Sequence, residues 1–196
     1  MIWIGLTGGI ACGKSAVGQI IERNGFSVID ADKMTRQVMI SGQRAYGEIV
    51  KIFGQGILDQ SGEIDRKALG KRVFADPEKL KILEQIVHPE VKEAVAKKRR
   101  ELASSGVGIC FYIVPLLFEK KMEAEFDRIL VVDCGVEEQR RRLKARDHLP
   151  DEQIEQRLKA QLPLADKKSK ATLVFDNSKD LAHLEKQVVD YLQTLI

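Results

Sequence analysis

The phosphate-loop pattern at residues 8–15 constrains the fold of this chain more than any other feature. These residues read Gly-Gly-Ile-Ala-Cys-Gly-Lys-Ser and satisfy G-x-x-x-x-G-K-[ST]. An apolar run of strand length precedes them and a helical pattern follows, which is the context that the pattern requires. Successive backbone N–H groups of such a loop turn inward around a phosphate, and the N-terminus of the helix adds a favourable dipole. The alternative is a glycine-rich turn with a solvated Lys14.

Two side chains of the pattern have direct roles in this interpretation. Lys14 would reach the β- and γ-phosphates of a nucleotide, and the hydroxyl of Ser15 would bind Mg²⁺. The sequence therefore predicts a magnesium nucleotide as ligand, with Mg²⁺ as the cofactor.

Short apolar runs and helical patterns alternate along the chain. The runs expected as strands are 2–6, 26–29, 109–114, 129–132 and 173–175. An amphipathic helix that ends near Gly25 follows the first run, and leucines and valines repeat at three and four residues from Leu181 to Leu195. This alternation is typical of an α/β fold with a mostly parallel sheet flanked by helices.

Two excursions from this alternation are predicted to be helical. Residues 34–105 contain no convincing strand but have two candidate helix starts, Asp76 before Pro77 and His88 before Pro89. Residues 136–170 hold a high density of basic side chains: Arg140, Arg141, Arg142, Lys144, Arg146, Arg157, Lys159, Lys167, Lys168 and Lys170. Such a run is either a solvated helix face or a lid whose arginines close over nucleotide phosphates, and the phosphate loop favours a lid. Both excursions are expected to fold within one unit, residues 1–196.

Acidic residues end the second apolar run. Asp30-Ala31-Asp32 would lie at the carboxyl edge of the sheet, where open α/β folds bind ligands. A carboxylate there can accept the proton of an attacking hydroxyl, and the two acids would share a face if the strand continued through them. Alternatively, Asp32 caps the helix that carries Met34 and Val38. Asp133, at the end of the fourth run, receives no role.

Composition excludes several other classes of protein. The formal net charge is only +3, and no apolar run approaches the length of a membrane span. The N-terminus runs straight into the glycine-rich segment without a secretion signal, so we expect a cytoplasmic protein. Three cysteines at wide spacings are expected to be reduced thiols, since they fit neither a disulfide framework nor a zinc site. The chain lacks the G-x-S-x-G pattern of serine hydrolases, which disfavours a hydrolase.

Cys12 is a special case because it stands inside the phosphate loop. If its sulfur is exposed, nearby N–H groups and the Lys14 ammonium favour the thiolate, and Cys12 should be the most reactive of the three cysteines. The alternative is that its sulfur is turned into the core and inert.

With these residues in view, the chain resembles the dephospho-coenzyme A kinases over almost its whole length. The strings that carry the resemblance are Leu6-Thr7-Gly8-Gly9-Ile10, Val28-Ile29-Asp30-Ala31-Asp32, Arg36, Asp65-Arg66, Leu69, Val73-Phe74, His88-Pro89, Val114-Pro115-Leu116-Leu117-Phe118-Glu119, Val131-Val132-Asp133, Arg142, Arg146-Asp147, Gln161 and Asp176-Asn177.

The resemblance implies transfer of the ATP γ-phosphoryl group to the 3′-hydroxyl of dephospho-coenzyme A, the last step of coenzyme A synthesis. It implies a P-loop kinase core, with residues 34–105 as the acceptor-binding insertion and residues 136–170 as the lid. ATP and dephospho-coenzyme A would be the partners of a monomer or small homo-oligomer, without nucleic acid or membrane.

The resemblance also implies roles for single residues. Asp32 would be the general base, Lys14 and Ser15 the phosphate and metal residues, and Arg142 and Arg146 the catalytic lid arginines. The ATP site would comprise Ala11, Cys12, Gly13, Lys14, Ser15, Ala16 and, near the adenine, Asn177. The acceptor site would be lined or supported by Arg36, His88, Pro115 and Glu119.

Three positions depart from the family's usual phosphate loop: Ala11, Cys12 and Ala16 stand where glycine, serine and threonine are common. None of them removes Lys14 or Ser15, but Ala11 needs a backbone conformation that tolerates a Cβ atom. The rival hypotheses are a nucleoside monophosphate kinase, a GTPase switch, which would need an N-K-x-D string that the chain lacks, and a nucleic-acid-binding module.

Overall fold

The computed structural model describes residues 1–195, apart from the side chain of Phe74. The chain divides into two compact units. The first comprises Met1–Asp30 and Ser105–Ile196, and the second comprises Ala31–Ser104. Each unit is described by itself.

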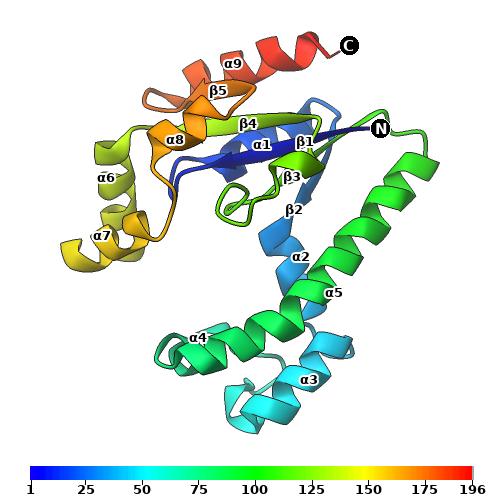
Figure 1. Ribbon diagram of the computed structural model, residues 1–196, viewed down its shortest axis with the longest axis vertical. Helices are drawn as coiled ribbons and strands as arrows, with labels where there is room; N and C mark the ends of the chain where they lie inside the picture. Colours follow the sequence, from blue (N-terminus) through cyan, green and yellow to red (C-terminus); the bar gives the residue numbers. More distant parts are fainter. Residues whose placement is uncertain (196) are drawn as a thin grey trace. The chain divides into compact units, whose positions relative to one another are not determined.

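A five-stranded parallel sheet forms the centre of the first unit (Figure 1). The strand order is β2-β3-β1-β4-β5. The strands are β1 (Ile2–Gly8), β2 (Ser27–Asp30), β3 (Ile109–Ile113), β4 (Arg128–Asp133) and β5 (Leu173–Asp176). All the pairings are parallel, which confirms the five strands expected from the apolar runs. Because β1 lies between β3 and β4, the loop that follows it emerges at the middle of the carboxyl edge.

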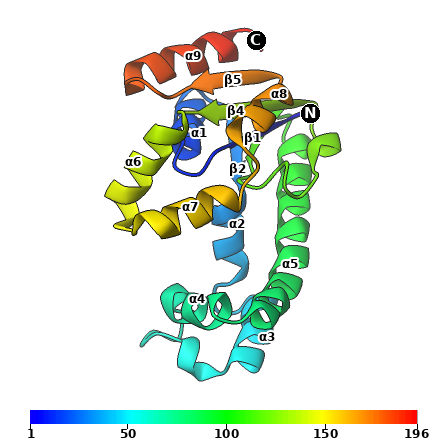
Figure 2. The ribbon, with the colours of Figure 1, turned by 60° about the vertical axis from the view of Figure 1, so that its left-hand side comes forward.

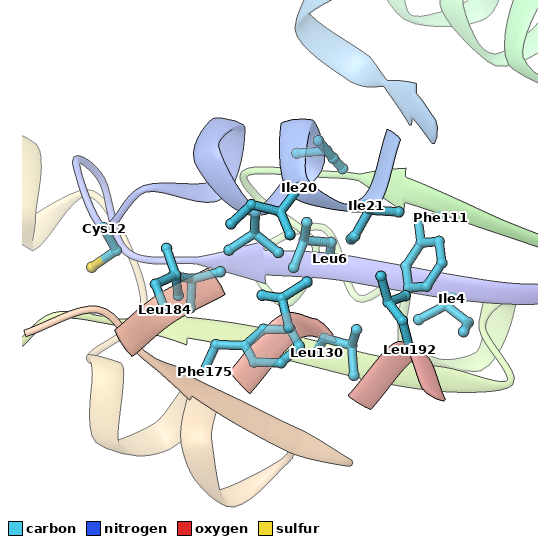
Figure 3. Close-up of a cluster of buried hydrophobic side chains, with 14 of the residues drawn as sticks. Ile4, Leu6, Cys12, Ile20, Ile21, Phe111, Leu130, Phe175, Leu184 and Leu192 are labelled. Atoms are coloured by element: carbon cyan, nitrogen blue, oxygen red, sulfur yellow. The ribbon is translucent and has the colours of Figure 1, made fainter. Parts of the chain in front are cut away.

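Helices α1 (Lys14–Arg23) and α9 (Leu181–Gln193) pack with one face of the sheet to form the main core. Figure 3 shows this cluster, in which Ile4 and Leu6 of β1 meet side chains from both helices. Alternate residues of β1 point to the other face, where Trp3 stacks on Phe126. As expected, Gly25 follows α1 with a φ of 84°, the left-handed conformation that commonly ends a helix.

Three helices follow β4 in the first unit (Figure 2): α6 (Val136–Asp147), α7 (Asp151–Lys159) and α8 (Leu164–Ser169). They occupy the arginine-rich segment. Helices α6 and α7 are joined by an ion pair in which Arg140 Nε lies 2.6 Å from Glu155 Oε1. A short 3-10 helix, η2 (Glu123–Glu125), precedes β4.

The second unit is helical. Its elements are α2 (Ala31–Val38), α3 (Arg44–Phe53), the 3-10 helix η1 (Gln55–Ile57), α4 (Arg66–Phe74) and α5 (Pro77–Ser104). These elements share a separate apolar core around Ile49, Ile57 and Leu69. Asp65 caps α4 by accepting from the backbone N–H of Lys67 and Ala68.

Helix α5 corrects one prediction from the sequence. Asp76 does accept from the backbone N–H of Glu78 and Lys79, so the helix start at Pro77 is confirmed. The predicted start at His88 is wrong, because α5 is one helix of 28 residues and Pro89 lies inside it. Burial of Ile86 and Val95 on either side stabilises one long helix despite the N–H that proline lacks. No helix in residues 1–195 is both long and apolar enough to cross a membrane.

Candidate active site

Gly13 gives the phosphate loop its shape at the start of α1. Its φ of 96° and ψ of 24° are left-handed, and its carbonyl accepts from the N–H of Ala16 and Val17. A Cβ atom at this position would come within 2.2 Å of Asn177 Nδ2. Only glycine fits both these dihedral angles and the available space. The first backbone N–H groups of α1, which follow Gly13, have no partners within the helix and can bind a ligand.

Ala11 also has a positive φ, of 60°. Glycine adopts this conformation without a steric penalty, whereas a Cβ atom costs about 1–2 kcal/mol. The departure noted in the sequence therefore falls on a strained residue.

Lys14 and Ser15 are the first two residues of α1. The Lys14 ammonium folds back over the loop, where Nζ donates to the carbonyls of Gly9 at 2.9 Å and Gly8 at 3.2 Å. Ser15 is exposed in the first turn, and Ala16 follows it. The loop therefore gathers an ammonium, a free hydroxyl and a helix N-terminus.

Two of the predicted ATP-side residues lie directly on this loop. Asn177, which follows β5 and is buried, donates from Nδ2 to the carbonyl of Cys12 at 2.7 Å. Arg142 of α6 donates to the carbonyl of Asn177 at 2.8 Å and to that of Ala11 at 3.5 Å. Hydrogen bonds from Arg141 and Arg142 lower the pKa of Glu138 to about 2, so the carboxylate that accepts from Arg142 Nε stays ionised.

Arg146, one helical turn further along α6, lies elsewhere. Its guanidinium makes two hydrogen bonds to Asp147, at 2.7 and 3.0 Å, and its side chain is 59% exposed. The structure therefore brings Arg142 to the phosphate loop and leaves Arg146 in a surface ion pair.

Two glutamines hold the loop at Ile10 and received no role in the sequence analysis. Gln161 Oε1 accepts from the N–H of Ile10 at 2.9 Å, and Gln139 Nε2 donates to its carbonyl at 2.8 Å. Gln139 is nearly fully buried on α6, a position for which a single sequence holds no signal. A pocket of about 480 Å³ opens beside them, lined by Gly9, Gln139, Arg140, Glu155, Gln161 and Leu164 among others.

The acidic pair after the second strand differs from one expectation. Strand β2 ends at Asp30 and α2 begins at Ala31, so the strand does not continue to Asp32 and the two acids do not share a strand face. Asp32 is the second residue of α2 rather than its cap. An exposed carboxylate in the first turn is favoured by the helix dipole, and it stays accessible to a substrate.

The remaining acceptor-side residues lie in both units. Arg36 is exposed in the last turn of α2, and His88 is exposed within α5. In the first unit, the carbonyl of Pro115 accepts from Thr7 Oγ1 at 3.3 Å.

Glu119 is at the centre of a buried ion pair. Its Oε1 accepts from the N–H of Leu162 at 2.8 Å and lies 2.8 Å from Nζ of Lys167, whose side chain is 0% exposed. Burial alone would raise the pKa of Glu119, but the Lys167 ammonium and the hydrogen bond from the N–H of Leu162 outweigh it and hold the pKa below its usual value. Its other oxygen, Oε2, is buried without a hydrogen-bond partner among the described residues.

Asp133 and Cys12 both have structural surroundings. Asp133 Oδ2 lies 2.7 Å from Lys168 Nζ, and Oδ1 accepts from the N–H of Gly135. The sulfur of Cys12 is fully buried in the main core, so the structure agrees with the alternative in which it is turned inward. All three cysteines are free thiols, as expected.

A divalent metal fits this donor set only together with a nucleotide. The described residues contain no group of three or more His, Cys, Asp or Glu side chains that could hold a metal ion. The exposed Ser15 hydroxyl beside the loop fits Mg²⁺, which usually keeps several waters and takes its other ligands from substrate phosphates.

Comparisons with known proteins point to one family. The family model described as Dephospho-CoA kinase matches residues 2–183. A dephospho-CoA kinase from Carboxydothermus hydrogenoformans is 44% identical over 190 residues, covering 97% of this chain and 92% of that protein. A crystal structure from Thermus thermophilus is 35% identical with a TM-score of 0.81 and covers 100% of this chain and 98% of its own. A dephospho-CoA kinase from Campylobacter jejuni is 28% identical with a TM-score of 0.72, with coverages of 98% and 96%.

Proposed function

Because the chain belongs to the dephospho-CoA kinase family, we propose that its phosphate loop and Asp32 carry the transfer of the ATP γ-phosphoryl group to the 3′-hydroxyl of dephospho-coenzyme A. The chain is a P-loop kinase that phosphorylates dephospho-CoA with ATP in coenzyme A biosynthesis. The observation that supports the site most strongly is the left-handed Gly13 at the start of α1, with Lys14 folded over the loop.

The ATP side of the site consists of residues 11–16 together with Arg142 and Asn177. The backbone N–H groups of the loop and of the first turn of α1 bind the β- and γ-phosphates. Lys14 exchanges its two carbonyl partners for phosphate oxygens, which carry more negative charge. Arg142 lies within reach of the loop and neutralises charge that spreads over the γ-phosphoryl oxygens in the transition state.

Ser15 provides the protein's ligand to Mg²⁺. Bound Mg²⁺ neutralises negative charge on the β- and γ-phosphates when ATP is present. The protein's own part is to hold the Ser15 hydroxyl at the N-terminus of α1, where it faces solvent.

The acceptor side depends on a base. Asp32 accepts the proton of the ribose 3′-hydroxyl as that oxygen attacks the γ-phosphorus, and the products are coenzyme A and ADP. Its place in the first turn of α2 leaves its side chain exposed to solvent. Residues 34–105 bind the acceptor, with Arg36 and His88 contributing.

Pro115 and Glu119 support the acceptor from the first unit. Glu119 acts indirectly, because its ion pair with Lys167 and its hydrogen bond from the N–H of Leu162 hold the segment that carries Pro115. Residues 136–170 act as the lid, with Arg142 and Arg146 closing over the phosphates. We further propose a cytoplasmic enzyme that is a monomer or small homo-oligomer, with no nucleic-acid or membrane partner.

Calorimetric titration with ATP tests the phosphate site. Wild type should bind Mg-ATP, and Lys14→Ala should bind it at least about tenfold more weakly. In a separate activity assay, removal of Mg²⁺ by a chelator should abolish turnover. Lys186→Ala is the matched control, because Lys186 pairs with Asp190 on the exposed surface of α9. Equal ATP affinity in wild type and Lys14→Ala would contradict the proposal that the phosphate loop binds ATP.

A further inference from the structure

Two of the three thiols meet inside the first unit. Cys12 and Cys134, which are 122 positions apart in the chain, have their Sγ atoms 3.0 Å apart. Both residues are buried, with relative exposures of 0% and 2%. Figure 3 draws Cys12 at one end of the main core. Cys110 lies apart on β3, where its thiol faces the carbonyl of Phe111.

The pair joins the phosphate loop to the end of a central strand. Cys12 lies between the strained Ala11 and Gly13, and its carbonyl accepts from Asn177. Cys134 immediately follows β4, in a turn that Asp133 closes through the N–H of Gly135. A bond between the two sulfurs would therefore act directly on the backbone that surrounds a bound phosphate.

The two thiols are not equivalent. The Cys134 thiol donates a hydrogen bond to Cys12, which lowers the pKa of Cys12 against the opposing effect of burial; the Lys14 charge lowers it further. The same hydrogen bond, together with burial, raises the pKa of Cys134. Cys12 is therefore the nucleophile of the pair, and Cys134 is the resolving thiol that holds the proton.

We propose that Cys12 and Cys134 are a redox modification site, which a small peroxide oxidises to a reversible disulfide that disables the phosphate loop. The Cys12 thiolate attacks one oxygen of hydrogen peroxide, the O–O bond breaks, and hydroxide leaves to take up a proton. The resulting sulfenic acid is attacked by Cys134, which loses its proton as the S–S bond forms and water leaves. Two thiols and one peroxide thus give one disulfide and two waters.

Disulfide formation would pull on the loop. The Sγ atoms have to approach from 3.0 Å to about 2.05 Å, and Cys134 is the less movable partner because it is continuous with the central strand β4. A shift on the order of 1 Å in groups that position reacting atoms can lower turnover about 100-fold. Bound Mg-ATP would hold the loop in its reduced geometry, so it should slow the oxidation.

Thiol counting and peptide mapping on the full-length protein test the proposal. Hydrogen peroxide should remove two of the three thiols, and non-reducing digestion should yield a peptide that links Cys12 to Cys134. Turnover should fall about 100-fold in the oxidised fraction and return with dithiothreitol. Mg-ATP should slow both changes.

Cys134→Ala and Cys134→Ser are the matched variants, and Cys110→Ser is the control. The Cys134 variants should keep basal turnover, form no linked peptide and resist reversible inactivation, whereas Cys110→Ser should behave like wild type. A wild-type protein whose Cys12 and Cys134 stay unlinked under peroxide would overturn the proposal. A linked peptide without loss of ATP binding would contradict the proposal that the disulfide disables the phosphate loop. The thiol count does not depend on activity, so it tests disulfide formation even if the proposed function is wrong.

Discussion

At the scale of single residues, the strained Ala11 makes a testable difference. Its φ of 60° costs a residue with a Cβ atom about 1–2 kcal/mol, and glycine would relieve that strain at the expense of a more flexible unfolded chain. Ala11→Gly should therefore raise the free energy of unfolding by up to about 1 kcal/mol, measured by urea denaturation. Ala16→Gly in the first turn of α1 is the control, and it should lower stability by roughly 0.5–1 kcal/mol. A stability loss in Ala11→Gly would show that relief of strain at this position is smaller than the entropy cost of glycine.

The general base is tested at the same scale. Asp32→Asn should fold and bind ATP as wild type does, but lose turnover by about 10² to 10⁴, because an amide cannot accept the proton of the ribose hydroxyl. Steady-state assays and ATP titration separate these two effects. Asp30→Asn, at the end of β2, is the neighbouring control and should be milder. Near-normal turnover in Asp32→Asn would reduce Asp32 to a residue of the first helical turn.

Single residues were predictable where a local pattern determines their place. Gly13, Lys14 and Ser15 lie where the phosphate-loop pattern puts them, at the start of a helix. The contacts of Gln139 and Gln161 with Ile10 were not predictable, because they join segments more than 100 positions apart and depend on tertiary packing. The direction of the Cys12 sulfur was open for the same reason.

At the scale of elements, α6 carries both proposed lid arginines but places them differently. Arg142 contacts the carbonyls of Ala11 and Asn177, and Arg146 is paired with Asp147. Arg142→Ala and Arg146→Ala should each lower turnover while the binding constant of the acceptor stays within a few fold, since both arginines act on ATP phosphates. Arg142→Ala should have the larger effect and also weaken ATP binding. Loss of acceptor affinity alone in either variant would move that arginine away from the ATP side.

The buried ion pair between Glu119 and Lys167 joins the segment that follows β3 to helix α8. Glu119→Gln should lower the free energy of unfolding at neutral pH by about 3 kcal/mol, because it leaves a fully buried ammonium without its counter-charge. Glu123→Gln is the control: it breaks the exposed pair with Lys170 and should cost less than about 1 kcal/mol.

The same pair predicts a pH dependence with a definite sign. Since the pKa of Glu119 is lower in the folded protein than its ordinary 4.5, its stabilising effect is present above that value and is lost as the pH falls through the folded-state pKa. Denaturation between pH 7 and pH 3 should therefore show a smaller stability loss in Glu119→Gln than in wild type. Equal losses in the two proteins would mean that the ion pair contributes nothing.

Elements were easier to predict than their ends and interruptions. All five strands were found because short apolar runs bounded by turns are typical of a buried parallel sheet. The false helix start at His88 arose because proline in the first turn and proline inside a helix look alike in sequence. The core of the second unit decides in favour of one continuous α5.

At the scale of the whole molecule, the proposed roles are distributed over both compact units. The phosphate loop, Arg142 and Asn177 belong to the first unit, whereas Asp32, Arg36 and His88 belong to the second. ATP binding is therefore expected to depend on the first unit, and turnover on both. The sequence indicated the helical composition of residues 34–105, but their assignment to the acceptor rests on resemblance to a family, because no local pattern in that segment specifies a ligand.

The measurement that tests the central claim most directly is the dependence of ADP formation on the acceptor. Purified protein with Mg-ATP should form one ADP for each dephospho-coenzyme A supplied, and mass spectrometry with NMR should find the new phosphate on the ribose 3′-oxygen. Coenzyme A is the matched control, since its 3′-hydroxyl is already phosphorylated, and it should support no ADP formation. ADP formation at the same rate without dephospho-coenzyme A, or a new phosphate at another position, would contradict the account.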